Sequence, residues 1–260
     1  MASTFTGTAR ALTANGIAAS LDRLGVDAAT LWALLTVETS GCGYLPDRRP
    51  QILYERHLFH RLTNGAFDDG DISAAEAGGY GPSGAPQYDR LARAVQLDRA
   101  AAIKSTSWGL GQILGLNSAA AGHASADDMV DAMTASEDGQ LAAVASFIVS
   151  EQIQGALQRR DWAAYASRYN GPSYQKNQYD TRLAAAYQKY TAGSMPDLGI
   201  RAAQLYLTYL GFHPGPVDGV AGAQTRSAIA RYQSGHGLAA TGIVDDALAA
   251  RLESDAQGGS

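Results

Sequence analysis

The stretch "LLTVETSGCG", from Leu34 to Gly43, ends an apolar run with a carboxylate, Glu38, that stands directly before a Thr-Ser-Gly turn. In a helix over residues 27–39, three leucines of this run and Glu38 fall at i, i+3, i+4 and i+7, so Glu38 continues the predicted buried stripe. Burial and the negative end of the helix dipole both disfavour the charged form, and we expect a raised pKa for Glu38. Such a carboxyl group can act as a general acid that protonates a leaving-group oxygen. The alternative is a position at the edge of the last turn, from which the side chain bends into solvent.

Length and composition indicate a folded protein with two cores. The chain has 260 residues, enough for one ordinary domain and a smaller one. Hydrophobic residues make up 46% and charged residues 17%, which excludes a disordered chain. The formal net charge of −5 argues against a nucleic-acid partner and gives no electrostatic reason for adhesion to an anionic surface. We expect a partner to be held mainly by hydrogen bonds and stacking.

Cysteine and histidine usage argues against metal chemistry. Cys42 is the single cysteine, so an internal disulfide and a multi-cysteine zinc site are excluded, and we expect it to be a small packing residue. Of the five histidines, only His57 and His60 are spaced as metal ligands could be. We predict no metal and no cofactor.

The N-terminus carries no basic start followed by an apolar core, and no window approaches the ~18 apolar residues of a membrane span. We therefore expect synthesis in the cytoplasm without a signal peptide, and no membrane partner. Nothing in the pattern suggests a dimer seam, so we expect a monomer.

Residues 20–190 are predicted to be mainly helical. Asp27, Ser125 and Asp161 stand where helix N-caps belong, and "TASE" (Thr134 to Glu137) has the form of a capping box ahead of a long apolar helix. One continuous helix is expected over residues 87–104. Periodicity does not decide whether "QILYERHLFHRL" (51–62) is a strand or a helix.

A second unit follows a segment of linker composition. "TAGSMPDLG" (191–199) is rich in small and turn-forming residues. Beyond it, three helices are expected over residues 200–256, around one small core. We thus predict a domain over 1–190, a linker over 191–199 and a small three-helix domain over 200–256.

Three segments of the first domain resemble a known superfamily. "ETSG" (38–41), "SWGLGQILG" (107–115) and "RYNGP" (168–172) occur in the order found in goose-type lysozymes and lytic transglycosylases. With "RPQILYERHLF" (49–59) added, the closer match is to the N-acetylmuramidase domain of phage endolysins. The resemblance covers roughly residues 20 to 190.

This resemblance implies a mainly α protein whose catalytic domain has a lysozyme-like α+β fold, helical with a small β element. It also implies that Glu38 is the catalytic acid. The residues that it would assign to substrate binding are Ser107, Gly109, Gln112, Tyr169 and Asn170. A helix start with tightly packed glycines is the other interpretation of "GLGQILG", but it leaves Gln112 unexplained.

Glu55 is the leading candidate for a second carboxylate, because a segment returning across the cleft could place it opposite Glu38. It would activate water or stabilise an oxocarbenium-like transition state. The alternative is an ion pair with Arg56, Arg61 or His57. The choice bears on the reaction: a hydrolase uses two carboxylates, whereas a lytic transglycosylase manages with one because the sugar's own 6-hydroxyl attacks.

The C-terminal unit resembles the small peptidoglycan-binding domain that is fused to many cell-wall hydrolases. "QLYLTYLGF" (204–212) and "GPVDGVAGAQTRSAIARYQ" (215–233) carry the pattern. Much of it is structural, since its glycines permit tight turns and its leucines and alanines build a core. The candidate binding residues are Asp218, Gly219, Thr225, Tyr232 and Gln233.

Together these resemblances predict a modular endolysin. It would cleave the β-1,4 bond between N-acetylmuramic acid and N-acetylglucosamine in peptidoglycan glycan strands, and would reach the wall after the membrane is permeabilised. Three alternatives stay open: a lytic transglycosylase, a chitinase of related fold, and a non-catalytic wall-binding or virion component.

Overall fold

The computed structural model describes residues 5–39, 41–67, 69–171 and 174–258, so Ser40 of the "ETSG" turn and Pro172 of "RYNGP" lie outside the described residues. The elements before the first strand are α1 (Ala14–Leu24) and α2 (Ala28–Thr39). The others, in chain order, are β1 (Ile52–Tyr54), α3 (Arg56–Leu62), α4 (Pro86–Leu97), α5 (Arg99–Lys104), β2 (Thr106–Trp108), β3 (Ile113–Leu114), η1 (Gly115–Asn117), α6 (Ala126–Ala135), α7 (Glu137–Ser150), α8 (Gln154–Gln158), α9 (Trp162–Tyr169), η2 (Tyr174–Asn177), α10 (Tyr179–Ala192), α11 (Leu198–Tyr209), α12 (Ala223–Gly235) and α13 (Asp246–Ala256). The predicted mainly α fold with a small β element is confirmed.

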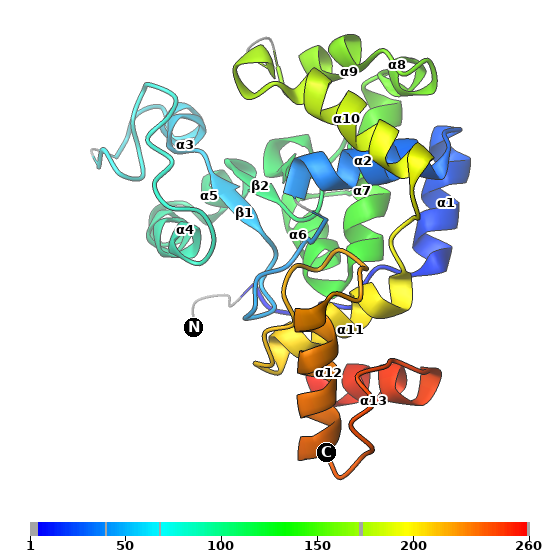
Figure 1. The fold of residues 1–260 in the computed structure, drawn as a ribbon. Helices are drawn as coiled ribbons and strands as arrows, with labels where there is room; N and C mark the ends of the chain where they lie inside the picture. The colour runs from blue at the N-terminus through cyan, green and yellow to red at the C-terminus, as the bar shows by residue number, and fades with distance from the viewer. Residues whose placement is uncertain (1–4, 40, 68, 172–173, 259–260) are drawn as a thin grey trace.

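Helix α2 is the central helix of the larger part of the chain and packs along α10 (Figure 1). Asp27 caps it, accepting a hydrogen bond from the Thr30 amide at 2.8 Å, as predicted. Within α2 all residues except Ala28, Thr36 and Glu38 are buried. The leucines of the predicted stripe are buried as expected, but burial is not confined to that stripe, because most other residues of α2 are buried too. Glu38 is one of the three positions of this helix that are partly exposed.

The three strands form a small antiparallel sheet in the order β1-β2-β3. Leu53 pairs with Ser107, and Ser107 pairs with Leu114. The segment over residues 51–62 is both of the structures that periodicity left open: the apolar first half is strand β1, and the second half is helix α3. The "GLGQILG" segment begins with the turn between β2 and β3, not with a helix start.

The predicted helix ends are partly confirmed. Ser125 caps α6 and Asp161 caps α9 through side-chain hydrogen bonds to amides three residues on. The capping box over Thr134 to Glu137 is wrong, since Ser136 is the N-cap of α7 and accepts from the Gly139 amide at 3.0 Å. The expected single helix over 87–104 is divided into α4 and α5, because Asp98 has an extended backbone. Its amide donates to the Ala94 carbonyl at the end of α4, and its side chain caps α5 by accepting from the Ala101 amide.

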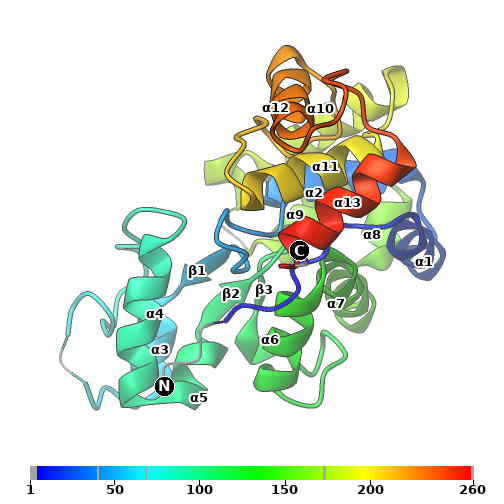
Figure 2. The same cartoon turned by 90° about the horizontal axis from the view of Figure 1, so that it is seen from below.

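The three C-terminal helices gather around a second hydrophobic core, and α11 and α13 lie side by side (Figure 2). This core is not closed by the C-terminal unit alone, since Ala9, Ala11 and Tyr44 from the first part of the chain belong to the same cluster. The predicted three-helix unit is thus present and sits directly on the larger part. The predicted boundaries at residues 190 and 200 stay a prediction.

Candidate active site

A cleft with a cavity volume of about 780 Å³ opens beside the end of α2. Its lining comes from several regions that lie far apart in the sequence. Glu38 and Thr39 contribute from the end of α2, the sheet residues Ser107 and Ile113 from β2 and β3, and further residues from the end of α9. The other lining residues used below are Gln51, Glu55, Gln112, Tyr169, Asn170 and Tyr179.

Glu38 lies in the cleft in a largely desolvated position. Burial raises the pKa of its carboxyl group to about 7, and a hydrogen bond from Asn170 and the positive charge of Arg182 limit the rise. The Asn170 Nδ2 atom donates to Glu38 Oε1 at 3.2 Å. A carboxyl group with this pKa holds its proton at near-neutral pH, as a general acid requires. The raised pKa predicted from the sequence is confirmed, and its main cause is burial.

Tyr169 and Asn170 are held at the end of α9. The Tyr169 hydroxyl donates to the Gly111 carbonyl at 2.8 Å, which ties α9 to the turn of the hairpin. Its ring stacks on Tyr165 with centroids 5.1 Å apart and is nearly perpendicular to the Phe147 ring, with centroids 5.6 Å apart. The aromatic packing fixes the helix end that presents Asn170 to Glu38.

Helix α10 supplies two further groups that the sequence did not single out. Tyr179 lines the cleft, and burial together with the Glu38 charge raises the pKa of its hydroxyl. Arg182 donates to the Val37 carbonyl at 3.1 Å and so binds the last turn of α2. The "QYDTR" segment was predicted only as a helix, because its distance of more than 130 residues from Glu38 leaves no local signal.

Glu55 lines the same cleft as Glu38, from the junction of β1 and α3. Burial raises the pKa of its carboxyl group, and the Tyr80 hydroxyl partly opposes that rise. The Oε2 atom lies 3.3 Å from His57 Nδ1, but neither atom has a hydrogen-bond partner among the described residues. The structure thus places Glu55 in the cleft, and of the three neighbours expected for an ion pair it brings His57 closest.

The hairpin residues divide into those that face the cleft and one that does not. Ser107 and Gln112 are lining residues, whereas Gly109 is not among them. Gln112 has a left-handed backbone, with φ of 50°, and its side-chain amide donates to the Gly109 carbonyl at 2.9 Å and to the Gln51 carbonyl at 3.2 Å. Gly109 has φ of 68°, and a Cβ there would stand 2.7 Å from Gln140 Cδ, so this position requires glycine.

Gln140 of α7 is another residue that sequence reasoning missed. Its Oε1 atom accepts from the Leu110 amide at 2.7 Å, and the Leu110 carbonyl in turn accepts from the Thr39 hydroxyl at 2.9 Å. The end of α2 and the hairpin turn are therefore fixed to each other through a buried glutamine. Gln140 is fully buried, and its place directly before the apolar run that starts at Leu141 is the one signal that could have drawn attention to it.

The candidate binding residues of the C-terminal unit all make internal contacts. The Thr225 hydroxyl donates to the Pro214 carbonyl at 3.0 Å, and Tyr232 donates to Asp255 at 2.5 Å. Gln204 Oε1 accepts from the amides of Asp218 and Gly219 at 3.0 and 2.9 Å. Gln233 Oε1 accepts from the Gly242 amide at 2.8 Å. These contacts brace the turns, and the predicted binding role of the five residues stays a prediction.

Burial raises the pKa of the Cys42 thiol to about 12, and the nearby Glu137 charge adds to the rise, so this cysteine is a packing residue as expected. In the described ranges, no group of three or more His, Cys, Asp or Glu side chains is arranged to hold a metal ion. A search of the helices in the same ranges finds none with the length and apolar character needed to cross a membrane.

A mainly helical domain with a small sheet, whose cleft holds a desolvated carboxyl group and a second carboxylate, has the fold and the groups of a glycoside hydrolase of the lysozyme type. The family model "N-acetylmuramidase" matches residues 27–191, and the model "Putative peptidoglycan binding domain" matches residues 197–252. The chain belongs to the N-acetylmuramidase family and is a glycoside hydrolase. The predicted resemblance to an N-acetylmuramidase joined to a peptidoglycan-binding domain is confirmed.

A solved structure agrees with this assignment. The crystal structure of Burkholderia AP3 phage endolysin is 39% identical to this chain, with a TM-score of 0.64, and the match covers 70% of this chain and 72% of that chain. No curated protein matches the chain.

Proposed function

We propose that this peptidoglycan hydrolase cleaves the β-1,4 bond between N-acetylmuramic acid and N-acetylglucosamine, with Glu38 as general acid. The observation that carries the proposal is the Glu38 carboxyl group, whose pKa burial raises to about 7 and which lines a cleft large enough for several sugar rings. The likeness to a phage endolysin supports peptidoglycan glycan strands as the substrate and the bacterial cell wall as the site of action.

The contacts around Glu38 suit proton donation to the glycosidic oxygen. Asn170 binds Oε1, and Oε2, which has no hydrogen-bond partner among the described residues, carries the proton that is transferred to the leaving group. As the carboxylate forms, the amide of Asn170 and the charge of Arg182 both stabilise it. The acid is therefore weak enough to be protonated near pH 7 and is still able to release its proton when the bond breaks.

Glu55 acts as the second carboxylate in this proposal. It lines the same cleft, and its Oε2 atom has no hydrogen-bond partner in the described part of the chain. In its ionised form it can activate a water molecule or stabilise the positive charge that develops on the sugar ring. Two carboxylates in one cleft favour hydrolysis over the transglycosylase reaction, which requires one.

Groups at the edge of the cleft hold the glycan in this scheme. Ser107 and Gln112 offer polar contacts along the sheet, and Asn170 Oδ1, without a partner among the described residues, can accept from a sugar hydroxyl or amide. The C-terminal unit would keep the enzyme at the wall and so raise its concentration at an insoluble substrate. We expect the enzyme to act as a monomer.

The test is product analysis on purified peptidoglycan with the wild type, Glu38→Gln and Glu55→Gln. We expect new reducing ends at N-acetylmuramic acid from the wild type, and a roughly 10²–10⁴-fold loss of kcat for Glu38→Gln. Undiminished turbidity clearance by Glu38→Gln would refute the assignment of the acid.

The same products separate the alternative reactions. Detection of 1,6-anhydro sugar ends by mass spectrometry would show that the reaction is that of a lytic transglycosylase and not hydrolysis. Retained activity in Glu55→Gln together with such ends would show that one carboxylate suffices. Binding to peptidoglycan without release of any fragment would indicate a non-catalytic wall component.

A further inference from the structure

The turn that follows Glu38 is held by an arginine of the C-terminal unit. Arg201 of α11 donates through Nε to the Gly41 carbonyl at 3.1 Å, and its Nη2 atom donates to the same oxygen. Gly41 stands three residues beyond Glu38, and its own amide donates to the Leu35 carbonyl at 3.1 Å, which closes the end of α2. An arginine about 160 positions along the chain therefore fixes the point where the acid-bearing helix ends.

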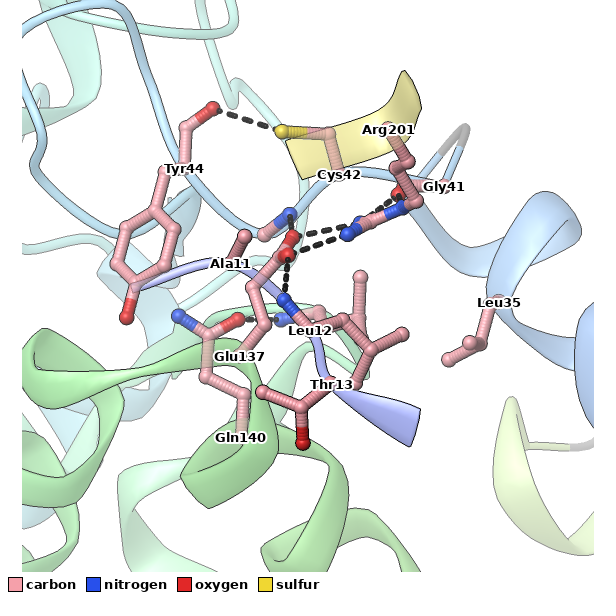
Figure 3. A network of polar contacts seen from close by, with 12 residues as sticks. Ala11, Leu12, Thr13, Leu35, Gly41, Cys42, Tyr44, Glu137, Gln140 and Arg201 are labelled. Atoms are coloured by element: carbon pink, nitrogen blue, oxygen red, sulfur yellow. Dashed lines mark hydrogen bonds and ion pairs between the residues drawn. The ribbon is translucent and has the colours of Figure 1, made fainter. Parts of the chain in front are cut away.

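The same guanidinium group is paired with Glu137 at the start of α7 (Figure 3). Arg201 Nη2 donates to Glu137 Oε1 at 2.7 Å, and Nη1 donates to Oε2. The two side chains are 1% and 0% exposed, so this is a fully desolvated bidentate pair. Burial opposes the positive charge of Arg201, and Glu137 more than offsets that effect, so the pKa of the guanidinium is raised.

Glu137 also binds the turn directly through hydrogen bonds. Its Oε1 atom accepts from the Gly43 amide at 2.9 Å, and its Oε2 atom accepts from the Leu12 amide at 3.0 Å. A Cβ at Gly43 would lie 1.9 Å from Gln140 Oε1, so the turn passes against α7 with no room for a side chain. Gly41 and Gly43 are thus held by the two members of one ion pair, Gly41 by Arg201 and Gly43 by Glu137.

Hydrogen bonds made by Gln51 connect this turn to the hairpin that lines the cleft. Gln51 donates through its amide to the Gly43 carbonyl at 2.8 Å and through its side chain to the Cys42 carbonyl at 2.9 Å. Its own carbonyl accepts from the Gly109 amide and from the Gln112 side chain. The segment that Arg201 and Glu137 anchor is therefore bonded to both the acid-bearing helix and the hairpin that lines the cleft.

We infer that Arg201 is a positioning residue for catalysis: through Gly41 and Glu137, the C-terminal unit sets the place of the Glu38 carboxyl group in the cleft. This inference rests on the proposed role of Glu38 as the acid. It gives the C-terminal unit a second task besides attachment to the wall. Hydrolysis of a soluble substrate, for which attachment is irrelevant, should then depend on Arg201.

The test compares full-length variants on soluble glycan oligomers prepared from peptidoglycan. Glu137→Gln/Arg201→Met removes both buried charges together and so avoids an unpaired charge. Tyr209→Phe is the control on the same helix, since the Tyr209 hydroxyl donates to the Ala9 carbonyl at 3.1 Å and makes no bond to the described residues of the turn. Folding is checked by circular dichroism and thermal unfolding.

For the double variant we expect kcat to fall roughly 10- to 100-fold with KM changed less than about twofold, because small misplacements of a reacting group are costly. The alkaline limb of its kcat–pH profile should move to lower pH, since a displaced Glu38 gains water. Binding to insoluble peptidoglycan should be kept, and Tyr209→Phe should match the wild type in all three readouts.

A folded double variant with the kcat and the alkaline limb of the wild type would overturn the inference. If the double variant does not fold, Arg201→Lys decides, because one ammonium group keeps the charge beside Glu137 but cannot reproduce the fork to Gly41. A wild-type kcat and pH profile in Arg201→Lys would then contradict the inference. Glu38→Gln is assayed alongside. If this variant stays active, the proposed acid is wrong. If it is inactive while the double variant behaves as the wild type, the role of Arg201 is refuted and the role of Glu38 is kept.

Discussion

Two glutamates, Glu38 and Glu137, are both withdrawn from solvent in this protein, and their surroundings give them opposite tasks. Glu137 meets a guanidinium group and two backbone amides, so its charge is fully compensated. Glu38 lies in the cleft and accepts a hydrogen bond from one side-chain amide. Because this bond does not offset the effect of burial, the pKa of Glu38 rises to about 7. The partners of a buried carboxyl group, more than the burial itself, decide whether it serves as a structural ion or as an acid.

The largest effect is expected when the compensation of Glu137 is removed. Arg201→Met leaves a buried carboxylate without its cation, and breaking a buried pair in this way costs about 3–5 kcal/mol of stability. Urea unfolding of the full chain measures the change. The double variant Glu137→Gln/Arg201→Met should recover most of the loss. A single variant as stable as the wild type would show that Glu137 needs no cation, and the contrast with Glu38 would fail.

The opposite effect is expected when the charge of Glu38 is removed. The ordinary pKa of the group is 4.5 and the folded value is about 7, so the folded chain keeps a proton that the unfolded chain loses as pH rises between these values. Stability therefore declines over that window, and above pH 7 the charged Glu38 costs about 3 kcal/mol. Glu38→Gln should be more stable than the wild type at pH 8 and similar to it at pH 4.

Unfolding experiments at the two pH values measure this difference. Glu76→Gln, at an exposed position, is the control and should change stability little at either pH. Equal stability of Glu38→Gln and the wild type at pH 8 would mean that Glu38 is not desolvated in solution.

A smaller effect is expected when the hydrogen bond from Asn170 to Glu38 is removed. Asn170→Ala removes the hydrogen bond that lowers the pKa of the carboxyl group, so this pKa should rise and the alkaline limb of kcat should move to higher pH. The kcat–pH profile on soluble glycan oligomers records the shift. A limb that moves to lower pH would show that Asn170 acts by excluding water and not by stabilising the carboxylate.

The raised pKa of Glu38 and three helix N-caps were predicted from the sequence, because a capping side chain and an acid at the end of an apolar run act over a few residues. Asp27, Ser125 and Asp161 cap helices as expected. The resemblance to a family brought in Tyr169 and Asn170, which lie far from Glu38 in the chain. Both line the cleft with Glu38, and Asn170 donates a hydrogen bond to it.

Long-range partners were missed. Glu137 was predicted as part of a capping box, because Thr-x-x-Glu has the same form whether or not the glutamate is buried. Its cation, Arg201, lies 64 residues further on, and a single sequence gives no sign of that pairing. Gln140, Tyr179 and Arg182 were missed for the same reason: their roles depend on packing between helices and not on local pattern.

The most direct test of the account is a titration of the Glu38 carboxyl group in the full-length protein by carbon-13 NMR, with Glu38→Gln used to assign the signal. We predict a midpoint near pH 7, and an alkaline limb of kcat on soluble glycan oligomers at the same pH. A Glu38 carboxyl group that titrates at its ordinary value of about 4.5, in an enzyme whose kcat is unchanged up to pH 9, would contradict the account.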